Sequence, residues 1–262
     1  MIAALNSADR VVIKVGSSSI TGANAESLHR IADAIATLRT LGKEVLLVSS
    51  GAIATGSPLL GLSAKPDDLA TSQALAGVGQ ARLMARYQAS FERHEIICAQ
   101  MLLTVDNLES ESHRRNALNA LERLLQLRVM PIINENDSVA TQEIRFGDND
   151  QLAARVAVLA QAQLLVLLSD VDGIYSQPPQ LPGAVHIPKI EYGAQLSEIE
   201  VSGTSTGYGT GGAVTKLAAA RLATSGGVAV VICSTADVAR LANEAVTHTF
   251  FEPNPRAASE KS

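Results

Sequence analysis

The chain has 262 residues, of which 47% are hydrophobic, so it can bury a large core in one domain or two lobes. Its net charge of −5 and the lack of a dense Lys/Arg cluster argue against a nucleic-acid or anionic-membrane partner. The N-terminus lacks the basic and apolar regions of a signal peptide, and no uncharged apolar run reaches the length of a membrane span. We therefore expect a soluble, cytoplasmic protein.

Short apolar runs alternate along the chain with longer helical patterns. The runs predicted to be strands are 10–15, 44–50, 96–103, 129–134, 164–169 and 228–234. The predicted helices are 25–40, 68–92, 113–127, 150–161 and 214–225. Most of the strands are apolar on both faces, as is typical of buried parallel strands. The pattern predicts an α/β fold, a three-layer sandwich with a central, mostly parallel sheet and helices on both faces.

Several other segments carry weaker signals. The alternating residues 139–146 could form a hairpin arm, and the Pro-rich residues 176–188 are predicted to be an exposed loop. The glycines of "GVGQAR" (77–82) lie within a predicted helix, where they favour close helix packing. A soft boundary near residue 165 would divide a single domain into an N-terminal lobe and a smaller C-terminal lobe.

The two cysteines, Cys98 and Cys233, both lie in apolar runs. They have no metal-ligand spacing and form no disulfide framework, so we expect small core residues in a reducing compartment, and no protein-held metal site.

Small, polar or glycine residues follow most of the predicted strands. They are 16–19, 49–52, 134–137 and 169–170. Ligands of open α/β sheets bind at the carboxyl ends of the strands. The shared pattern therefore predicts a binding site at this edge.

The stretch "KVGSSS" places Lys14 inside a strand that otherwise looks buried, followed by Gly16 and three hydroxyls. A buried lysine needs a partner, whereas an ordinary turn would point the lysine outward. In "SSGAIA" (49–54), backbone N–H groups could hold a carboxylate, although a plain Ser-Gly turn explains that segment equally well.

The glycine-rich stretch "GTGGAVTK" (209–216) opens a predicted helix that carries Thr215 and Lys216 in its first turn. It fits neither a Walker A loop nor a dinucleotide fingerprint, because no strand precedes the glycines. Glycines, a helix N-terminus and a lysine suit a phosphate chain. The alternative is a flexible surface loop with a helix cap.

Acidic and amide side chains gather in "INENDSVA" (133–140) and "GDND" (147–150). Asp148 is a good N-cap with Gln151 as its capping-box partner, so helix capping explains part of this pattern. The other interpretation is that these groups bind an ammonium-bearing ligand or orient lysines. No catalytic triad is visible.

With these motifs in place, the chain resembles the amino-acid kinase family over essentially its whole length, and especially the members that phosphorylate glutamate. The resemblance rests on residues 14–18, 49–54, 99–104, 131–140, 147–150, 167–175 and 209–216. It implies the amino-acid kinase fold and ATP-dependent phosphorylation of the γ-carboxylate of L-glutamate, the first step of proline synthesis. ATP with Mg²⁺ would be the co-substrate, L-proline a feedback inhibitor, and the protein a homo-oligomer, dimeric or tetrameric.

The resemblance also implies roles for individual residues. Lys14 and Lys216 would flank the transferring phosphoryl group, and Asp150 would hold and orient them. The residues expected to bind glutamate are Ser50, Asn134, Asp137, Asp148 and Asn149. The residues expected to bind ATP are Lys14, Ser169, Asp170, Thr210, Gly211, Gly212, Ala213, Val214, Thr215 and Lys216.

The chain departs from many glutamate-phosphorylating members, because it ends at Ser262 without room for their C-terminal PUA domain. We expect catalysis to survive this difference, which leaves regulation and assembly open. Alternatives that stay open are a family member acting on acetylglutamate, carbamate, aspartate or a nucleoside monophosphate, and a non-catalytic sensor of an amino acid or nucleotide. Such a sensor would be expected to lose Lys14, Lys216 or Asp150, and all three are present.

Overall fold

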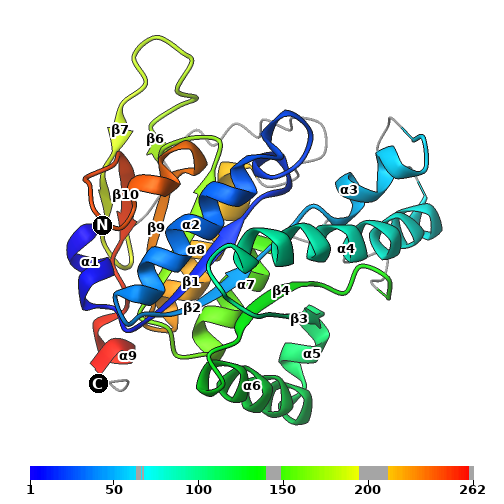
Figure 1. Cartoon of the computed structure of the whole chain (residues 1–262). Coiled ribbons are helices and arrows are strands. Elements are labelled where there is room, and N and C mark those ends of the chain that lie inside the picture. Colours follow the sequence, from blue (N-terminus) through cyan, green and yellow to red (C-terminus); the bar gives the residue numbers. More distant parts are fainter. Residues whose placement is uncertain (63–65, 67, 140–148, 195–211, 260–262) are drawn as a thin grey trace.

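The computed structural model describes residues 1–62, 66, 68–139, 149–194 and 212–259 (Figure 1). Its centre is an eight-stranded sheet in the order β3-β4-β2-β1-β5-β9-β10-β8. Every neighbouring pair is parallel except β9 and β10. The expected α/β class with a mostly parallel sheet is confirmed.

Six of the eight strands of the sheet lie close to the segments predicted from the sequence, and the other two, β8 and β10, were not predicted. Their bounds are β1 Arg10–Val15, β2 Glu44–Val48, β3 Cys98–Leu103, β4 Met130–Glu135, β5 Leu164–Ser169, β8 Lys189–Ile190, β9 Ala229–Ser234 and β10 His248–Phe251. The agreement follows from their composition, because five of the six residues of β1 and all six of β5 are buried.

Alternate residues of each central strand face two separate cores. Val11 and Ile13 pack into the core under α2 and α4, whereas Val12 between them packs into the core under α7 and α8. Figure 1 shows α2 in front of the sheet and α8 behind it. The helices on both faces complete the predicted three-layer sandwich.

Helices α2, α4, α6, α7 and α8 match the five predicted segments, whereas α1, α3, α5 and α9 were not predicted. Their bounds are α1 Ile2–Ser7, α2 Ser27–Thr40, α3 Ala52–Leu59, α4 Leu69–Glu92, α5 Val105–Glu109, α6 Glu111–Gln126, α7 Asn149–Leu159, α8 Ala213–Ser225 and α9 Pro255–Ser259, with 3-10 turns η1 Ser17–Ser19, η2 Gly22–Asn24 and η4 Thr235–Arg240. No described helix is long and apolar enough to cross a membrane.

Helices α3 and α4 pack against each other through glycines. A Cβ added at Gly79 would lie 1.8 Å from the carbonyl oxygen of Ala52, and one added at Gly56 would lie 2.1 Å from the carbonyl oxygen of Leu75. The close helix packing predicted for residues 77–82 is therefore confirmed. It brings α4 near the carboxyl end of β2.

The structure corrects one loop prediction and leaves two others untested. Residues 176–188 are not wholly a loop, because β7 (His186–Ile187) pairs antiparallel with β6 (Ile174–Tyr175). Two-residue strands are too short to give a recognisable sequence pattern. The possible hairpin arm at 139–146 lies almost entirely outside the described residues. The sheet runs continuously through β5, and the lobe boundary near 165 stays a prediction.

The two cysteines differ in burial. Cys233 is fully buried in β9, as expected of a core residue, whereas Cys98 is only half-buried at the start of β3. Both are free thiols, and burial raises the pKa of each to about 12. Burial therefore favours the neutral thiol form of both cysteines at neutral pH.

Candidate active site

Four adjacent parallel strands end side by side at one edge of the sheet. In the order β4, β2, β1 and β5, they bring Asn134, Ser50, Lys14 and Ser169 to the same edge. The first turns of α7 and α8 add Asp150 and Lys216 to this cluster. Residues from six separate segments thus meet where an open α/β sheet binds its ligands.

Three buried charges form the centre of the site. The Nζ of Lys14 lies 2.5 Å from Oδ1 of Asp150, and the Nζ of Lys216 lies 3.3 Å from Oδ2 of the same carboxylate. Lys14, Lys216 and Asp150 are 5%, 6% and 0% exposed, respectively, so all three charges are removed from bulk water. Lys14 therefore points into the site, and the alternative of an outward-facing lysine in an ordinary turn is wrong.

The two ammonium groups decide the ionisation of Asp150. Burial alone would raise its pKa, but the charges and hydrogen bonds of Lys14 and Lys216 outweigh burial and lower the pKa to about 2. The cluster consequently holds one carboxylate between two lysines, and these three side chains carry a net positive charge. A buried net positive charge is suited to an anionic ligand.

The start of α8 is shaped to expose backbone N–H groups. Gly212 caps the helix in an extended conformation without a side-chain cap. The hydroxyl of Thr215 donates to the carbonyl oxygen of Gly212 at 2.9 Å and lies 3.3 Å from Oδ2 of Asp150. The first turn of α8 therefore stays tied to the charged cluster, with its positive dipole end toward the site.

A chain of amide groups extends from the charged cluster toward α4. The Nδ2 of Asn149 donates to the Ser49 carbonyl oxygen at 2.6 Å, to Oγ of Ser50 at 3.0 Å and to Oδ1 of Asn134 at 2.8 Å. The Nδ2 of Asn134 in turn donates to Oε1 of Gln80 at 2.7 Å. The side chains of residues 80, 134 and 149 therefore fix one another's orientation.

Asp137 follows Asn134 along the chain, two residues beyond the end of β4. It is half-buried, and burial raises the pKa of its carboxyl group to about 6. A carboxylate held in such a position gains from a cationic ligand, because an adjacent ammonium favours the ionised form.

A second polar cluster lies at the ends of β5 and β9. The hydroxyl of Ser169 donates to Oδ1 of Asp170 at 3.0 Å, and Oγ1 of Thr235 donates to the Ser169 carbonyl oxygen at 3.0 Å. Ser19 of η1 reaches the same place, with its Oγ 2.9 Å from Oγ1 of Thr235. These contacts tie the segments that follow β1, β5 and β9 to one another.

The structure brings together most of the predicted site residues, and it adds two. Asp148, Thr210 and Gly211 lie outside the described residues, and their roles stay predictions. The added residues are Gln80 and Thr235, whereas Ser19 belongs to the stretch 16–19 that the sequence placed at the binding edge. Neither added residue lies in a local pattern that indicates a ligand, because Gln80 lies within a helix beside Gly77 and Leu83, and Thr235 is a single hydroxyl after a strand.

Most of the chain matches the sequence model of one protein family. Residues 9–234 match the model of the amino acid kinase family. The chain belongs to the amino acid kinase family. It is 55% identical over 251 residues to a protein of Clavibacter sepedonicus named glutamate 5-kinase, covering 96% of this chain and 97% of that one.

Another relative with the same name comes from Leifsonia xyli subsp. xyli. It is 52% identical over 257 residues, covering 98% of this chain and 95% of the relative. A relative of this name in Streptomyces coelicolor is 46% identical, and the chain covers 70% of it.

Solved structures share the fold at low sequence identity. The carbamate kinase of Giardia lamblia bound to AMP-PNP aligns with a TM-score of 0.65 at 15% identity, over 95% of this chain and 100% of the other. The isopentenyl phosphate kinase of T. acidophilum aligns with a TM-score of 0.63 at 15% identity, over 93% of this chain and 100% of the other. These likenesses confirm the amino-acid kinase fold that the resemblance implied.

Proposed function

We propose that the chain transfers the γ-phosphoryl group of ATP to the γ-carboxylate of L-glutamate, giving L-glutamyl 5-phosphate and ADP, the first step of proline biosynthesis. The observation that carries the proposal is the buried group of Lys14, Asp150 and Lys216 at the carboxyl edge of the sheet. The name shared by relatives at 52–55% identity over nearly the whole chain supports glutamate as the acceptor.

The reaction does not need a general base. A γ-carboxylate with an ordinary pKa of about 4.3 is already ionised at neutral pH. One of its oxygens forms a bond to the γ-phosphorus as the bond to the ADP oxygen breaks, and no proton moves. The absence of a catalytic triad in the sequence therefore agrees with this chemistry.

The main obstacle is electrostatic, because an anion must approach a polyanion. Lys14 and Lys216 converge from β1 and α8 and supply positive charge where charge develops on the phosphoryl oxygens. Asp150 remains ionised, since its pKa is about 2, and its role is to orient the two ammonium groups.

The side-chain amides of Asn134 and Asn149 and the groups beside them are proposed to recognise glutamate. Ser50, Asn134 and Asn149 offer fixed hydrogen-bonding groups to the carboxylates of the substrate. Asp137 is assigned to the α-ammonium, with Asp148 as a second acidic group. A free ammonium would satisfy acidic groups that an N-acetylated substrate would leave unpaired.

The nucleotide is proposed to bind between the carboxyl end of β5 and the N-terminus of α8. Ser169 and Asp170 lie at the end of β5, and Gly212 to Lys216 lie at the N-terminus of α8, while the roles of Thr210 and Gly211 rest on the sequence alone. Ala213 and Val214 open this helix, and Val214 is 55% exposed.

Mg²⁺ is proposed to be held chiefly by the nucleotide phosphates. Among the described residues no group of three His, Cys, Asp or Glu side chains is placed to ligate a metal ion, and Asp150 is engaged by two lysines. Bound with few protein ligands, Mg²⁺ would neutralise phosphate charge during transfer.

Release of ADP from Mg-ATP, measured with a panel of acceptors, tests the substrate assignment. L-Glutamate should support rapid release, while N-acetyl-L-glutamate, L-aspartate and carbamate should not. Comparable kcat/KM for L-glutamate and N-acetyl-L-glutamate would reject glutamate as the specific acceptor. ATP turnover with none of the four acceptors would point to the sensor alternative.

A further inference from the structure

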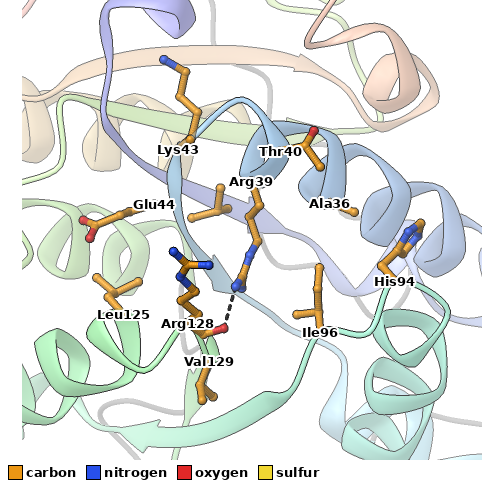
Figure 2. Close-up of a pocket in the computed structure, with 12 residues that line it drawn as sticks. Ala36, Arg39, Thr40, Lys43, Glu44, His94, Ile96, Leu125, Arg128 and Val129 are labelled. Carbon is orange, nitrogen blue, oxygen red and sulfur yellow. Dashed lines mark hydrogen bonds between the residues drawn. The ribbon is translucent and has the colours of Figure 1, made fainter.

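A pocket of about 560 Å³ lies at the opposite edge of the sheet from the candidate active site (Figure 2). It is lined by the C-terminal ends of α2 and α6 and by the residues that lead into β2, β3 and β4. Strands of five to six residues separate the two edges by roughly 15–20 Å. The pocket is therefore separate from the site described above.

Two arginines dominate the charge of this pocket. In Figure 2, Arg39 and Arg128 bring their head groups to the middle of it, and Nη2 of Arg39 donates to the Arg128 carbonyl oxygen at 2.6 Å. Within the part of the chain that the structure describes, neither guanidinium has a carboxylate within 4.0 Å. Burial lowers the pKa of Arg39, and the charge of Arg128 lowers it further.

The other charged groups that line the pocket already have partners. The Nζ of Lys43 points away from the arginines and donates to the Asn6 carbonyl oxygen. Glu44 is paired with Arg10, and His94 contacts Asp33. Glu44, the acidic residue of the pocket wall, is thus engaged elsewhere and does not neutralise Arg39 or Arg128.

Arg128 also occupies a backbone conformation that favours glycine. Its φ is +58°, in the left-handed region, directly after the end of α6. Gly42 and Gly227 occupy the equivalent place after α2 and α8, with φ of +82° and +78°. Glycine would relieve strain at this position, as it would at Glu95 and Gln161, the other described non-glycine residues with positive φ.

We propose that this pocket binds a small organic anion, with a carboxylate or phosphate group between Arg39 and Arg128 and an apolar body against the pocket wall. The wall is formed by Ala36, Val45, Ile96, Leu125 and Val129. Planar guanidinium groups bind carboxylates and phosphates in a bidentate manner, and the anion would compensate two adjacent positive charges. This proposal does not depend on the proposed kinase function.

The alternative is that Arg39 and Arg128 have a purely structural role. Arg39 could simply join α2 to the end of α6, but that contact uses only the backbone carbonyl of residue 128. Any residue at position 128 would supply this carbonyl. The side chain of Arg128 therefore distinguishes a binding site from a structural contact.

The test uses isothermal titration of the full chain with hexanoate, hexyl phosphate and inorganic phosphate, in the presence of saturating L-glutamate and Mg-ADP to fill the active site. Wild-type protein should bind hexanoate or hexyl phosphate more tightly than inorganic phosphate. Arg128→Gly should weaken this binding at least tenfold while its Tm is no lower than that of the wild type.

Gln161→Gly is the matched control. Gln161 also has a positive φ, +51°, after a helix at the same edge of the sheet, but it does not line the pocket. This variant should keep wild-type binding.

Preference for hexanoate or for hexyl phosphate would identify the anionic group. Unchanged binding in Arg128→Gly, equal loss in both variants, or no binding of either hexyl compound would overturn the proposal.

Discussion

The carboxylate of Asp150 lies 2.5 Å from the ammonium of Lys14, and both side chains are almost completely buried. This contact joins the end of the central strand β1 to the first turn of α7. Because Lys216 approaches the other oxygen of the same carboxylate, one side chain sets the position of both lysines. The geometry of the charged cluster therefore depends on Asp150 more than on either lysine alone.

Asp150→Asn should destabilise the protein by about 3–5 kcal/mol at pH 7, because it removes a buried carboxylate that contacts two buried ammonium groups. The folded-state pKa of Asp150, about 2, lies below its ordinary value of 3.8. Ionised Asp150 thus contributes stability above pH 4, on the order of 2 kcal/mol, which is lost as the pH falls through 2.

Urea unfolding at pH 7 and at several values between pH 4 and 2 measures both effects. Asp170→Asn is the control, because this residue is exposed at the same edge of the sheet and should change the free energy of unfolding by less than about 0.5 kcal/mol. Equal stability of the two variants at pH 7 would contradict the role of Asp150.

Asp137 should make catalysis depend on pH. Since its pKa is raised to about 6, and an α-ammonium binds the ionised form, kcat/KM for L-glutamate should fall as the pH drops through 6. Asp137→Asn should have a lower kcat/KM and lose this inflection. An inflection near pH 6 that persists in Asp137→Asn would assign the titration to another group.

Gln80 should act as a positioning residue that orients the side-chain amides of Asn134 and Asn149. Its Oε1 accepts from Nδ2 of Asn134, so Gln80→Ala removes the group that orients this amide. Loss of one such hydrogen bond, worth about 1 kcal/mol, should raise KM for L-glutamate about fivefold and leave kcat nearly unchanged.

The conservative variant Gln80→Glu retains an oxygen acceptor at the same distance along the side chain. It should restore most of the affinity that Gln80→Ala loses. If kcat fell and KM stayed the same in Gln80→Ala, Gln80 would not act through binding of glutamate.

L-Proline should inhibit by competing with L-glutamate. Proline has the same α-carboxylate and a secondary ammonium, so it can use the groups around Ser50 and Asp137, but it lacks the γ-carboxylate that accepts the phosphoryl group. Asp137→Ala should weaken both ligands together. Initial rates over a grid of both concentrations decide this, and inhibition that persists at saturating glutamate would place the proline site elsewhere.

The layers of the fold could be predicted well from the sequence, and the connections between site residues less well. Strands such as β5 are apolar on both faces, and a short apolar run between helical patterns is typical of a buried parallel strand. Gln80 was missed because its partner Asn134 is 54 residues away, and no local pattern reveals such a contact. The same holds for Thr235, whose partner Ser19 is 216 residues away.

Trapping of the product with hydroxylamine tests the central claim most directly, because an acyl phosphate reacts with hydroxylamine to form a hydroxamate. Wild-type protein with Mg-ATP and L-glutamate should yield γ-glutamyl hydroxamate. Lys14→Ala and Lys216→Ala should each lower kcat on the order of 100-fold to 1000-fold, with a smaller change in KM for glutamate. Near-normal kcat in either lysine variant, or ADP release without any hydroxamate, would contradict the account.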